Sequence, residues 1–365
     1  MKIAEIVQFL EEVAPLSYQE SYDNAGLILG QKNWDCTGAI LCLDSLEEVV
    51  DEAIAKGCNL IIAHHPIVFF GLKKINGKNY IERILIKAIK ADIAIYASHT
   101  NLDSVLRQGV NTKIAEKLGL QNLRILSPKK GLLLKLQTYV PAQNLEAVRE
   151  ALFAAGAGQI GNYSECSFEQ KGQGSFKGNA QSQPHLGQKE QRHYEAEHKL
   201  EVILPKQIQH KVLAALKKAH PYEEVAYELI ALENAHQEVG IGVVGELPEA
   251  QDSLDFLKSL KQKMATDCVK YTHIHQPKVQ RIAICGGAGS FLLGAAKGAG
   301  ADVFVTADYK YHEFFDADGQ LIIADLGHYE SEQFTIELFY ELISQKFPNF
   351  TVHKTTVRTN PVNYL

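Results

Sequence analysis

Two stretches of this 365-residue chain share one pattern, and that pattern constrains the fold more than any other feature. In the first stretch, short apolar runs alternate with segments of helical periodicity; the runs are 39–44, 59–66 and 93–103. The second stretch repeats the plan with runs at 281–287, 301–308 and 321–332. Short apolar strands separated by helices indicate a parallel or mixed sheet that is covered on both faces. The chain is therefore predicted to have an α/β core made of two similar βαβ-type lobes that face one another.

The middle of the chain, residues 128–235, does not follow that pattern. Its segments read as strand, helix, strand, strand, helix and strand, which is the order of a ferredoxin-like α+β unit. Residues 170–198 are rich in Gln, Gly, His and Ser, a composition typical of a mobile loop. We therefore predict a discontinuous core, formed by residues 1–127 and 236–365, with an α+β domain inserted at 128–235. A chain of this length is long enough for two domains.

Composition and charge narrow the class of protein. The formal net charge is −6, and no basic patch with interleaved aromatic residues is visible, so neither nucleic acid nor an anionic membrane is an expected partner. A nucleotide is not excluded, because metal ions can supply positive charge. No apolar run reaches the ~20 residues that span a bilayer, and residues 1–16 predict an amphipathic surface helix rather than a signal peptide. The six cysteines form no CxxC pair, which favours free thiols in a reducing cytoplasm.

A histidine pair follows one of the apolar runs. His64 and His65 come directly after NLIIA and before Pro66. Neighbouring residues on a strand point to opposite faces, so two adjacent imidazoles do not easily chelate one ion. At a strand end, where the chain turns, they can diverge towards two neighbouring sites. The pair therefore favours two metal ions over one, although unliganded histidines at the mouth of a loop are the commoner case.

Carboxylates and a third histidine lie at corresponding strand ends. Asp103 closes the run at 93–103 and is either a helix cap or a carboxylate that bridges two cations. His328 and Glu332 share one face of a predicted helix, a spacing used for paired metal ligands and also for surface salt bridges. Glu330, between them, is predicted to be solvated. Because sites in open α/β sheets lie beyond the carboxyl ends of the strands, one set of residues is expected to meet there: His64, His65, Asp103, His328 and Glu332.

The residue types in this set narrow the choice of metal. Mixed imidazole and carboxylate ligands without cysteine fit zinc, iron or manganese, and argue against copper(I) or a structural cysteine–zinc site. Two divalent ions per chain are predicted. His99 and His312 are candidate proton carriers, because an imidazole titrates near pH ~6.5. The turn CGGAGS at 285–290 either holds a phosphate on its backbone N–H groups or allows a helix to pack closely on a strand.

Six segments together resemble a known family, the GTP cyclohydrolase I type 2 homologues, which are dinuclear-metal, Ngg-interacting-factor-like proteins. In chain order these segments are SYDNAGLILG, AHHP, SHTNLD, GGAGS, GADVFVTADYKYHE and GHYESE. The middle part, with YVP, GAGQIGNYSECSF and HPYEE, resembles the PII-like or CutA-like domain of longer members. Two departures are visible, since YDN stands where many members have WDN, and TAD where many have TGD.

The resemblance implies a three-layer α/β core, the same five metal ligands, and a toroidal homohexamer whose metal sites face an internal cavity. It also implies metal-dependent hydrolysis of a nucleotide-like substrate, with ring opening of GTP as the specific reaction. From the residues alone, a phosphoester is an equally reasonable substrate. The alternative is a regulatory protein whose PII-like insert senses a small molecule and whose metal centre is structural or a metal store. That alternative rests on the insert, which a simple hydrolase does not need.

Overall fold

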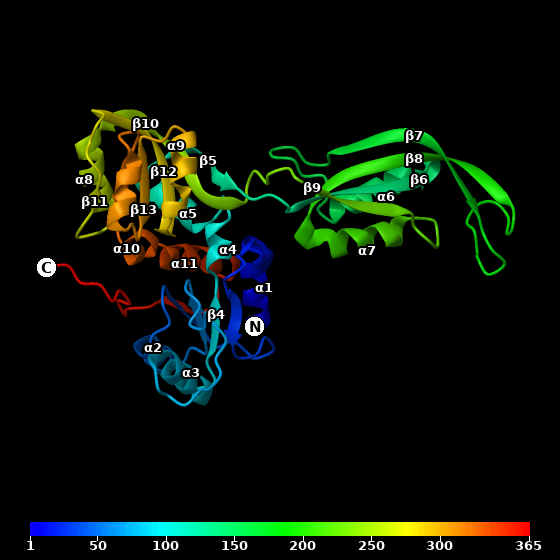
Figure 1. Cartoon of the computed structure of the whole chain (residues 1–365). Helices are drawn as coiled ribbons and strands as arrows, with labels where there is room; N and C mark the ends of the chain where they lie inside the picture. Colours follow the sequence, from blue (N-terminus) through cyan, green and yellow to red (C-terminus); the bar gives the residue numbers. More distant parts are fainter. The chain divides into compact units, whose positions relative to one another are not determined.

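The computed structural model describes all residues, 1–365, and divides them into two compact units (Figure 1). The larger one, called the core unit here, consists of Met1–Pro128 and Glu238–Leu365. The smaller one, called the insert, is Lys129–Gln237, where the sequence predicts 128–235. None of the helices has the length and apolar character that spanning a membrane requires.

The first lobe of the core unit is built on a five-stranded sheet with the order β1–β4–β3–β2–β15. Its middle strands are short parts of the predicted apolar runs and pair in parallel: β2 (Ala39–Cys42), β3 (Leu60–Ala63) and β4 (Ala94–Ala97). Every residue of these strands is buried, as expected for strands covered on both faces. The edges are β1 (Gly26–Leu29), antiparallel to β4, and β15 (Val352–Lys354), parallel to β2.

Amphipathic helices cover this sheet. The helices α2 (Glu47–Ala55) and α3 (Tyr80–Lys90) pack Val50 and Ile84 into one cluster with Ile61 of β3. The predicted amphipathic helix at the start of the chain is confirmed as α1 (Ile3–Val13), which buries four apolar residues along one face. The long helix α11 (Thr335–Lys346) contacts β2 and β15. The apolar spacing of the sequence thus accounts for the layers of this lobe.

The second lobe holds a six-stranded sheet with the order β11–β14–β13–β12–β10–β5. Its three parallel strands contain the predicted runs: β12 (Lys278–Ala288), β13 (Val303–Ala307) and β14 (Ile322–Asp325). Three antiparallel strands extend this sheet: β5 (Gln121–Pro128), β10 (Gly240–Asp252) and β11 (Lys270–Tyr271). The helices α5 (Val110–Leu118) and α8 (Ser253–Lys263) contact β10 and β12, while α9 (Leu293–Gly298) contacts β5. The core unit is therefore a mixed α/β structure with two sheets.

The insert has the predicted order of elements and an apolar core of its own. Its elements are β6 (Leu133–Pro141), α6 (Leu145–Ala154), β7 (Ser167–Lys177), β8 (Arg192–Pro205), α7 (Gln209–Ala219) and β9 (Tyr227–Leu232). The strands form an antiparallel sheet with the order β7–β8–β6–β9. Leu136, Leu200 and Val212 are fully buried or nearly so between this sheet and the two helices. The likeness to PII or CutA domains stays a prediction.

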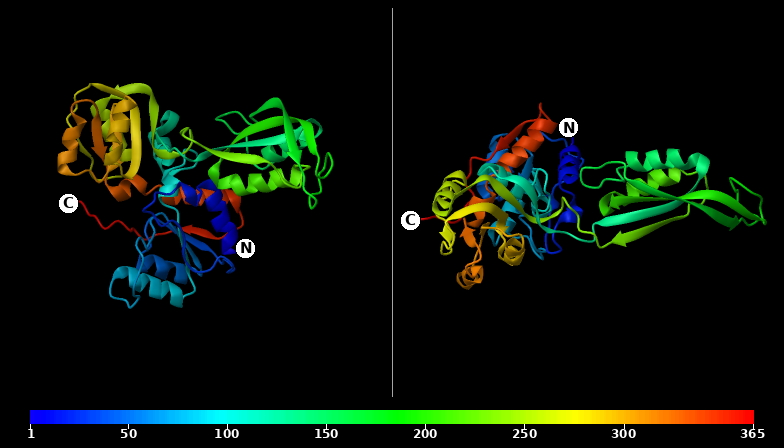
Figure 2. Two further views of the ribbon diagram at one scale, coloured as in Figure 1. Left: turned by 45° about the vertical axis from the view of Figure 1, so that its right-hand side comes forward. Right: turned by 90° about the horizontal axis from the view of Figure 1, so that it is seen from above.

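The prediction of a mobile loop at 170–198 is wrong. β7 and β8 pair continuously from Ser167 opposite Val202 to Lys177 opposite Arg192, so only residues 178–191 connect them. Figures 1 and 2 show this hairpin reaching beyond α6 and α7. Most of β7 is exposed, so its sequence lacks the apolar alternation by which a half-buried strand is recognised. A polar composition therefore does not exclude a regular strand when most of that strand is exposed to solvent.

Candidate metal centre

Four histidines and two carboxylates come together where the two lobes of the core unit meet. His64 and His65 follow β3, and His99 precedes the short helix α4 (Thr100–Asp103), which ends in Asp103. The second lobe supplies both ends of α10 (His328–Glu332). Gly327, at φ 90°, turns the chain from the end of β14 into this helix. The carboxyl ends of strands in two different sheets thus supply one site.

Glu332 lies between two groups of ligand atoms. Its Oε2 is 3.0 Å from Nε2 of His65 and 3.1 Å from Nε2 of His328. Its Oε1 is 3.7 Å from Nε2 of His64, which is 3.6 Å from Oδ1 of Asp103. Within each group, the ligand atoms lie no more than 4.8 Å apart. Glu332, rather than Asp103, is therefore the carboxylate that both groups share.

Hydrogen bonds at Nδ1 orient all four imidazoles. Each Nδ1–H donates to an oxygen outside the cluster, at 2.6–2.8 Å. The pairs are His64 with the Ser98 carbonyl, His65 with Asp44, His99 with Asp23, and His328 with Asp308. Metal-binding histidines almost always have such a partner, because it fixes the tautomer and leaves the Nε2 lone pair for the metal.

Burial and neighbouring charges shift the pKa values of these groups in opposite directions. Burial alone would lower the pKa of both imidazoles, but hydrogen bonds to carboxylates raise that of His65 to about 9 and that of His328 to about 11. Burial and the nearby Glu332 raise the pKa of Asp103 to about 7. For Glu332, the histidines outweigh burial and hold its pKa well below the usual range. A bound cation would displace the Nε2 protons and allow Asp103 to ionise beside the already ionised Glu332.

Two atoms of the cluster are buried without a hydrogen-bond partner. They are Nε2 of His64 and Oδ1 of Asp103. Their separation of 3.6 Å is too long for a hydrogen bond. A buried polar atom left unpaired costs about 1–3 kcal/mol. A divalent cation held by these atoms and Glu332 would satisfy both, and the nitrogen and oxygen donors suit zinc, iron or manganese. The residues present thus fit the predicted metal centre.

A glycine pair lets Glu332 approach the end of β12. Gly287 has φ +62°, and a Cβ built there would lie 2.4 Å from Oε1 of Glu332. The N–H groups of Gly286 and Gly287 donate to Oδ1 of Asn111 and Oγ of Ser331, at 2.8 and 2.9 Å. These donors are therefore already used within the protein. Close packing, rather than phosphate binding, is the role that this geometry supports for the turn.

A cavity of about 780 Å3 opens beside the cluster. His65, His99 and His328 reach it, and so do the carboxylates of Asp44 and Asp308. Other residues give it aromatic and cationic walls: Phe69, Lys270, Tyr329 and Tyr364. The Lys270 ammonium pairs with the buried carboxylate of Asp325 at 2.8 Å. The cluster thus borders a space large enough for a small molecule.

Two residues differ from what the sequence predicts: His312 lies away from the cavity, and Glu330 is buried. His312 is exposed on the 3-10 helix η5 (Tyr311–Ala317), against Tyr311 and Phe315, and does not line the cavity. The prediction that Glu330 is solvated is wrong. Glu330 is only 4% exposed, and its Oε1 accepts a hydrogen bond from the side-chain amide of Asn360. Exposure cannot be inferred from helical spacing when another segment covers the helix.

Sequence reasoning assigned no role to two partners of the site. Asp23 lies in the SYDN segment, 76 positions from His99, and holds that imidazole at 2.8 Å. Thr359, near the end of the chain, donates from Oγ1 to Oδ2 of Asp44 at 2.6 Å. No local spacing connects residues so far apart. The resemblance of SYDN to a family motif was the one available signal for Asp23, and Thr359 had none.

Comparisons with known proteins agree over the full length. The chain matches the family model described as Duf34/NIF3 (NGG1p interacting factor 3) over residues 1–361. Proteins named GTP cyclohydrolase 1 type 2 homolog are 39% identical in Bacillus subtilis, covering 99% of this chain and 98% of that one, and 38% identical in Halalkalibacterium halodurans, covering both chains fully. The crystal structure of a Bacillus cereus protein related to NIF3 has a TM-score of 0.86 at 37% identity, covering 100% of this chain and 99% of that one. The chain therefore belongs to the Duf34/NIF3 family.

Proposed function

We propose that the chain binds two divalent cations and hydrolyses a nucleotide-like small molecule in the cavity beside them. In this proposal His64, Asp103 and Glu332 hold one cation, and His65, His328 and Glu332 hold the other. The observation that carries the proposal is the pair of buried atoms without partners, Nε2 of His64 and Oδ1 of Asp103. Zinc, iron and manganese all suit these donors.

The chain's own residues prepare the site for this chemistry. When bound, a pair of such cations supplies Lewis acidity and a nucleophilic hydroxide at neutral pH. Asp44 and Asp308 orient His65 and His328 and increase their basicity as ligands. The shared carboxylate of Glu332 provides negative charge between the two positions, which reduces the repulsion between like charges.

His99 is left for proton transfer. It forms a third group with His64 and His65, but that group contains no carboxylate to balance a divalent charge. Asp23 fixes its Nδ1, and the side chain lines the cavity. Nε2 of His99 can therefore accept a proton at the cavity and return it to a leaving group. His312 takes no part in this proposal.

The cavity walls favour a substrate with a planar ring and a negative charge. Phe69 and Tyr329 offer aromatic surface, and the ammonium group of Lys270, although it is paired with Asp325, lies in the same lining. Rings of this kind stack on planar groups, and a lysine ammonium attracts phosphate as a point charge. GTP is the first substrate to try, because the relatives are named GTP cyclohydrolase 1 type 2 homolog. A phosphodiester is the second.

Turnover by metal-loaded protein tests the proposal. Wild type, Glu332→Gln and the exposed His312→Ala are each incubated with GTP and with a panel of phosphodiesters, and products are separated by chromatography. We expect product with wild type and His312→Ala, and at least a hundredfold less with Glu332→Gln. Two bound metal ions without any product from GTP or the panel would contradict the hydrolase proposal.

A regulatory protein is the second candidate function. The insert favours it, because this unit folds around its own apolar core and supplies no ligand to the metal centre. In this case the metal centre is structural or stores metal. Bound metal without turnover, in the experiment above, is the result that would favour this candidate over the first.

A further inference from the structure

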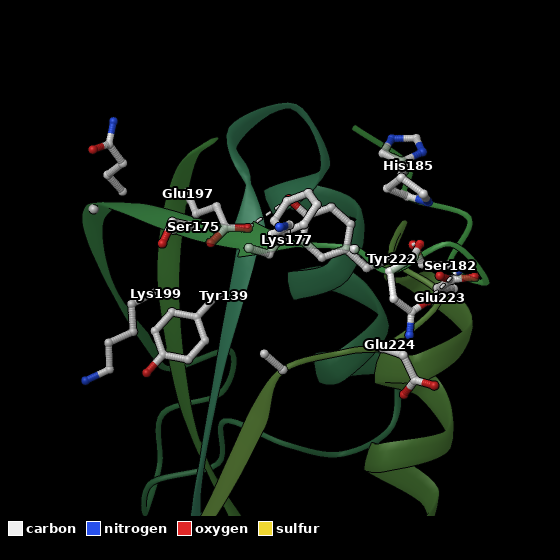
Figure 3. Close-up of a pocket in the computed structure, with 18 of the residues that line it drawn as sticks. Tyr139, Ser175, Lys177, Ser182, His185, Glu197, Lys199, Tyr222, Glu223 and Glu224 are labelled. Carbon is white, nitrogen blue, oxygen red and sulfur yellow. Dashed lines mark hydrogen bonds between the residues drawn. The ribbon is translucent and has the colours of Figure 1, made fainter. Parts of the chain in front are cut away.

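The insert contains a cavity that the metal chemistry does not use. Figure 3 shows residues that line it. Its volume is about 810 Å3, within the range of small-molecule sites. The walls come from β7, β8, the connection at 178–191 and the turn at 220–224. A hydrogen bond of 2.7 Å from the Gln183 N–H to Oε1 of Glu223 ties the connection to the turn. Two of the elements that line the cavity are therefore bonded to one another.

A buried histidine fixes one wall of this cavity. Nε2–H of His220 donates to the Tyr139 carbonyl at 2.9 Å, and its Nδ1 accepts from the Tyr222 N–H at 3.2 Å. Burial lowers the pKa of His220, which favours the neutral ring that this pattern requires. The hydroxyl of Tyr222 donates to Oε1 of Glu197 at 2.8 Å. The ring of Tyr222 is thus held at both ends and presents its faces in a defined orientation.

Two glycines of β7 line the cavity, and one of them leaves its part of the lining without a side chain. Gly172 and Gly174 lie within β7, where glycine weakens a strand and often marks the close approach of a ligand or another backbone. A Cβ at Gly174 would lie 2.0 Å from Oε2 of Glu197, and one at Gly172 would meet nothing within 4 Å. Gly174 is therefore explained by Glu197, whereas the space above Gly172 is empty.

Alongside the carboxylates of Glu197, Glu223 and Glu224, the lining of the cavity offers aromatic rings and lysines. Phe176 and His185 flank Tyr222, with ring centroids 6.1 and 6.4 Å away, so aromatic faces border the cavity. Lys199 is paired with Glu201. Lys177 has no carboxylate partner, although it lines the same space (Figure 3). Aromatic walls beside an unpaired ammonium group suit a planar ring that carries a negative charge.

We propose that the insert binds a small aromatic anion in this cavity, with its ring against Tyr222 and Phe176 and its charged group at Lys177. The site is independent of the metal centre and of the reaction proposed for it. Lys177 supplies the attraction for the anion, and the hydrogen bonds at His220 and Glu197 hold Tyr222 in place before the ligand arrives. Such preorganisation reduces the entropy lost on binding.

A matched pair of fluorescent probes tests the proposal on the full-length protein as purified. Anilinonaphthalene sulfonate carries a negative charge, and phenylnaphthylamine has the same rings without that charge; both brighten in apolar surroundings. Titrations compare wild type with Lys177→Met, Tyr222→Ala and the control Lys218→Met, an exposed lysine of α7. Circular dichroism checks that each variant is folded. Since Lys177 is exposed, its replacement does not endanger the fold.

We expect saturable binding of the sulfonate to wild type. Lys177→Met should weaken it about three- to tenfold and leave the uncharged probe within about twofold, because an exposed charge contributes modestly. Tyr222→Ala should weaken both probes, and Lys218→Met neither. Absence of saturable binding, or equal affinity of wild type and Lys177→Met for the sulfonate, would overturn the proposal. A loss of both probes in Lys177→Met would overturn the assignment of the charge to Lys177.

Discussion

Among single residues, the side chains of the candidate metal centre depend on a second set of hydrogen bonds. Asp44 shows this most clearly, because each of its oxygens has one partner. Oδ1 accepts from His65 at 2.8 Å, and Oδ2 accepts from Thr359 at 2.6 Å. Burial would raise the pKa of Asp44, but these partners hold it below the usual range. Asp44 is therefore ionised and fixed, and it orients His65.

Removing the Thr359 hydroxyl should weaken metal binding without touching a ligand. In Thr359→Val the side chain keeps its shape, but Asp44 loses a hydrogen bond and His65 becomes less well oriented. Loss of such outer partners costs about 10–100-fold in metal affinity, and we expect about tenfold here. Competition with a chromophoric zinc chelator measures the effect. Thr359→Ser, which keeps the hydroxyl, should resemble wild type, and equal affinities for the valine and serine variants would contradict this role.

Replacing Gly287 should damage both the fold and the site. Gly287 and Gly319 have nearly the same φ, +62° and +63°, so alanine at either position strains the backbone by about 1 kcal/mol. At Gly287, the added Cβ would also meet Glu332, whereas at Gly319 it would meet nothing within 4 Å. We therefore expect both variants to unfold at lower urea concentration, with a loss of metal in Gly287→Ala alone. Full metal content in Gly287→Ala would show that Glu332 is free to move.

At the scale of elements, the turn after α7 links the stability of the insert to pH. His220 is buried there, 6% exposed, and burial holds its pKa below the ordinary value near ~6.5. The folded insert therefore binds this proton less readily than the unfolded chain does. As the pH falls through the ordinary histidine value, unfolding takes up a proton and becomes more favourable.

The expected result is an insert that loses stability between pH 7.5 and 5.5. Pulse proteolysis at increasing urea concentrations measures this stability as the urea midpoint of unfolding. Mapping the cleavage products to 129–237 separates the midpoint of the insert from that of the core unit. His220→Asn should be less stable at pH 7.5 but should show a smaller dependence on pH. The same pH dependence in both proteins would mean that other groups of the insert cause it.

The elements that carry the site could largely be predicted from the sequence. β3 and β14 are apolar runs, and the two ends of α10 are four residues apart, so local spacing finds them. The strand β10 does not belong to the repeated strand–helix plan, because it lies antiparallel beside β12. Its second half is exposed, so the apolar pattern of a buried strand covers only its first half. β15 has three residues, too few for any periodicity. Contacts between distant segments, such as Thr359 with Asp44, leave no pattern in the sequence at all.

For the molecule as a whole, the candidate metal centre joins two parts of the chain that the insert separates. The first 128 residues supply three of the proposed ligands, and the part after the insert supplies His328 and Glu332. The insert supplies none. Bound metal should therefore stabilise the core unit and leave the insert unchanged, because only the folded core presents the ligands together.

Hydrogen exchange with and without zinc checks this difference. At a free zinc concentration of about 100 times Kd, the core should gain about 2.7 kcal/mol of stability for one site. Amides of β3 and β14 that exchange through unfolding of the core should slow accordingly. Amides of β6 and β8 in the insert serve as the internal control. Equal slowing in both units would contradict a metal site confined to the core.

Metal content per chain is the decisive measurement for a two-metal site on Glu332. Elemental analysis after incubation with zinc, iron or manganese should give about two equivalents for wild type and for the exposed control His312→Ala. His64→Ala should retain about one equivalent of metal, because only the group of His64, Asp103 and Glu332 is lost. Glu332→Ala should retain almost no metal, because both ligand groups share that carboxylate. A folded wild type that binds no metal under any of these conditions, or a Glu332→Ala variant that keeps both ions, would rule out this two-metal site.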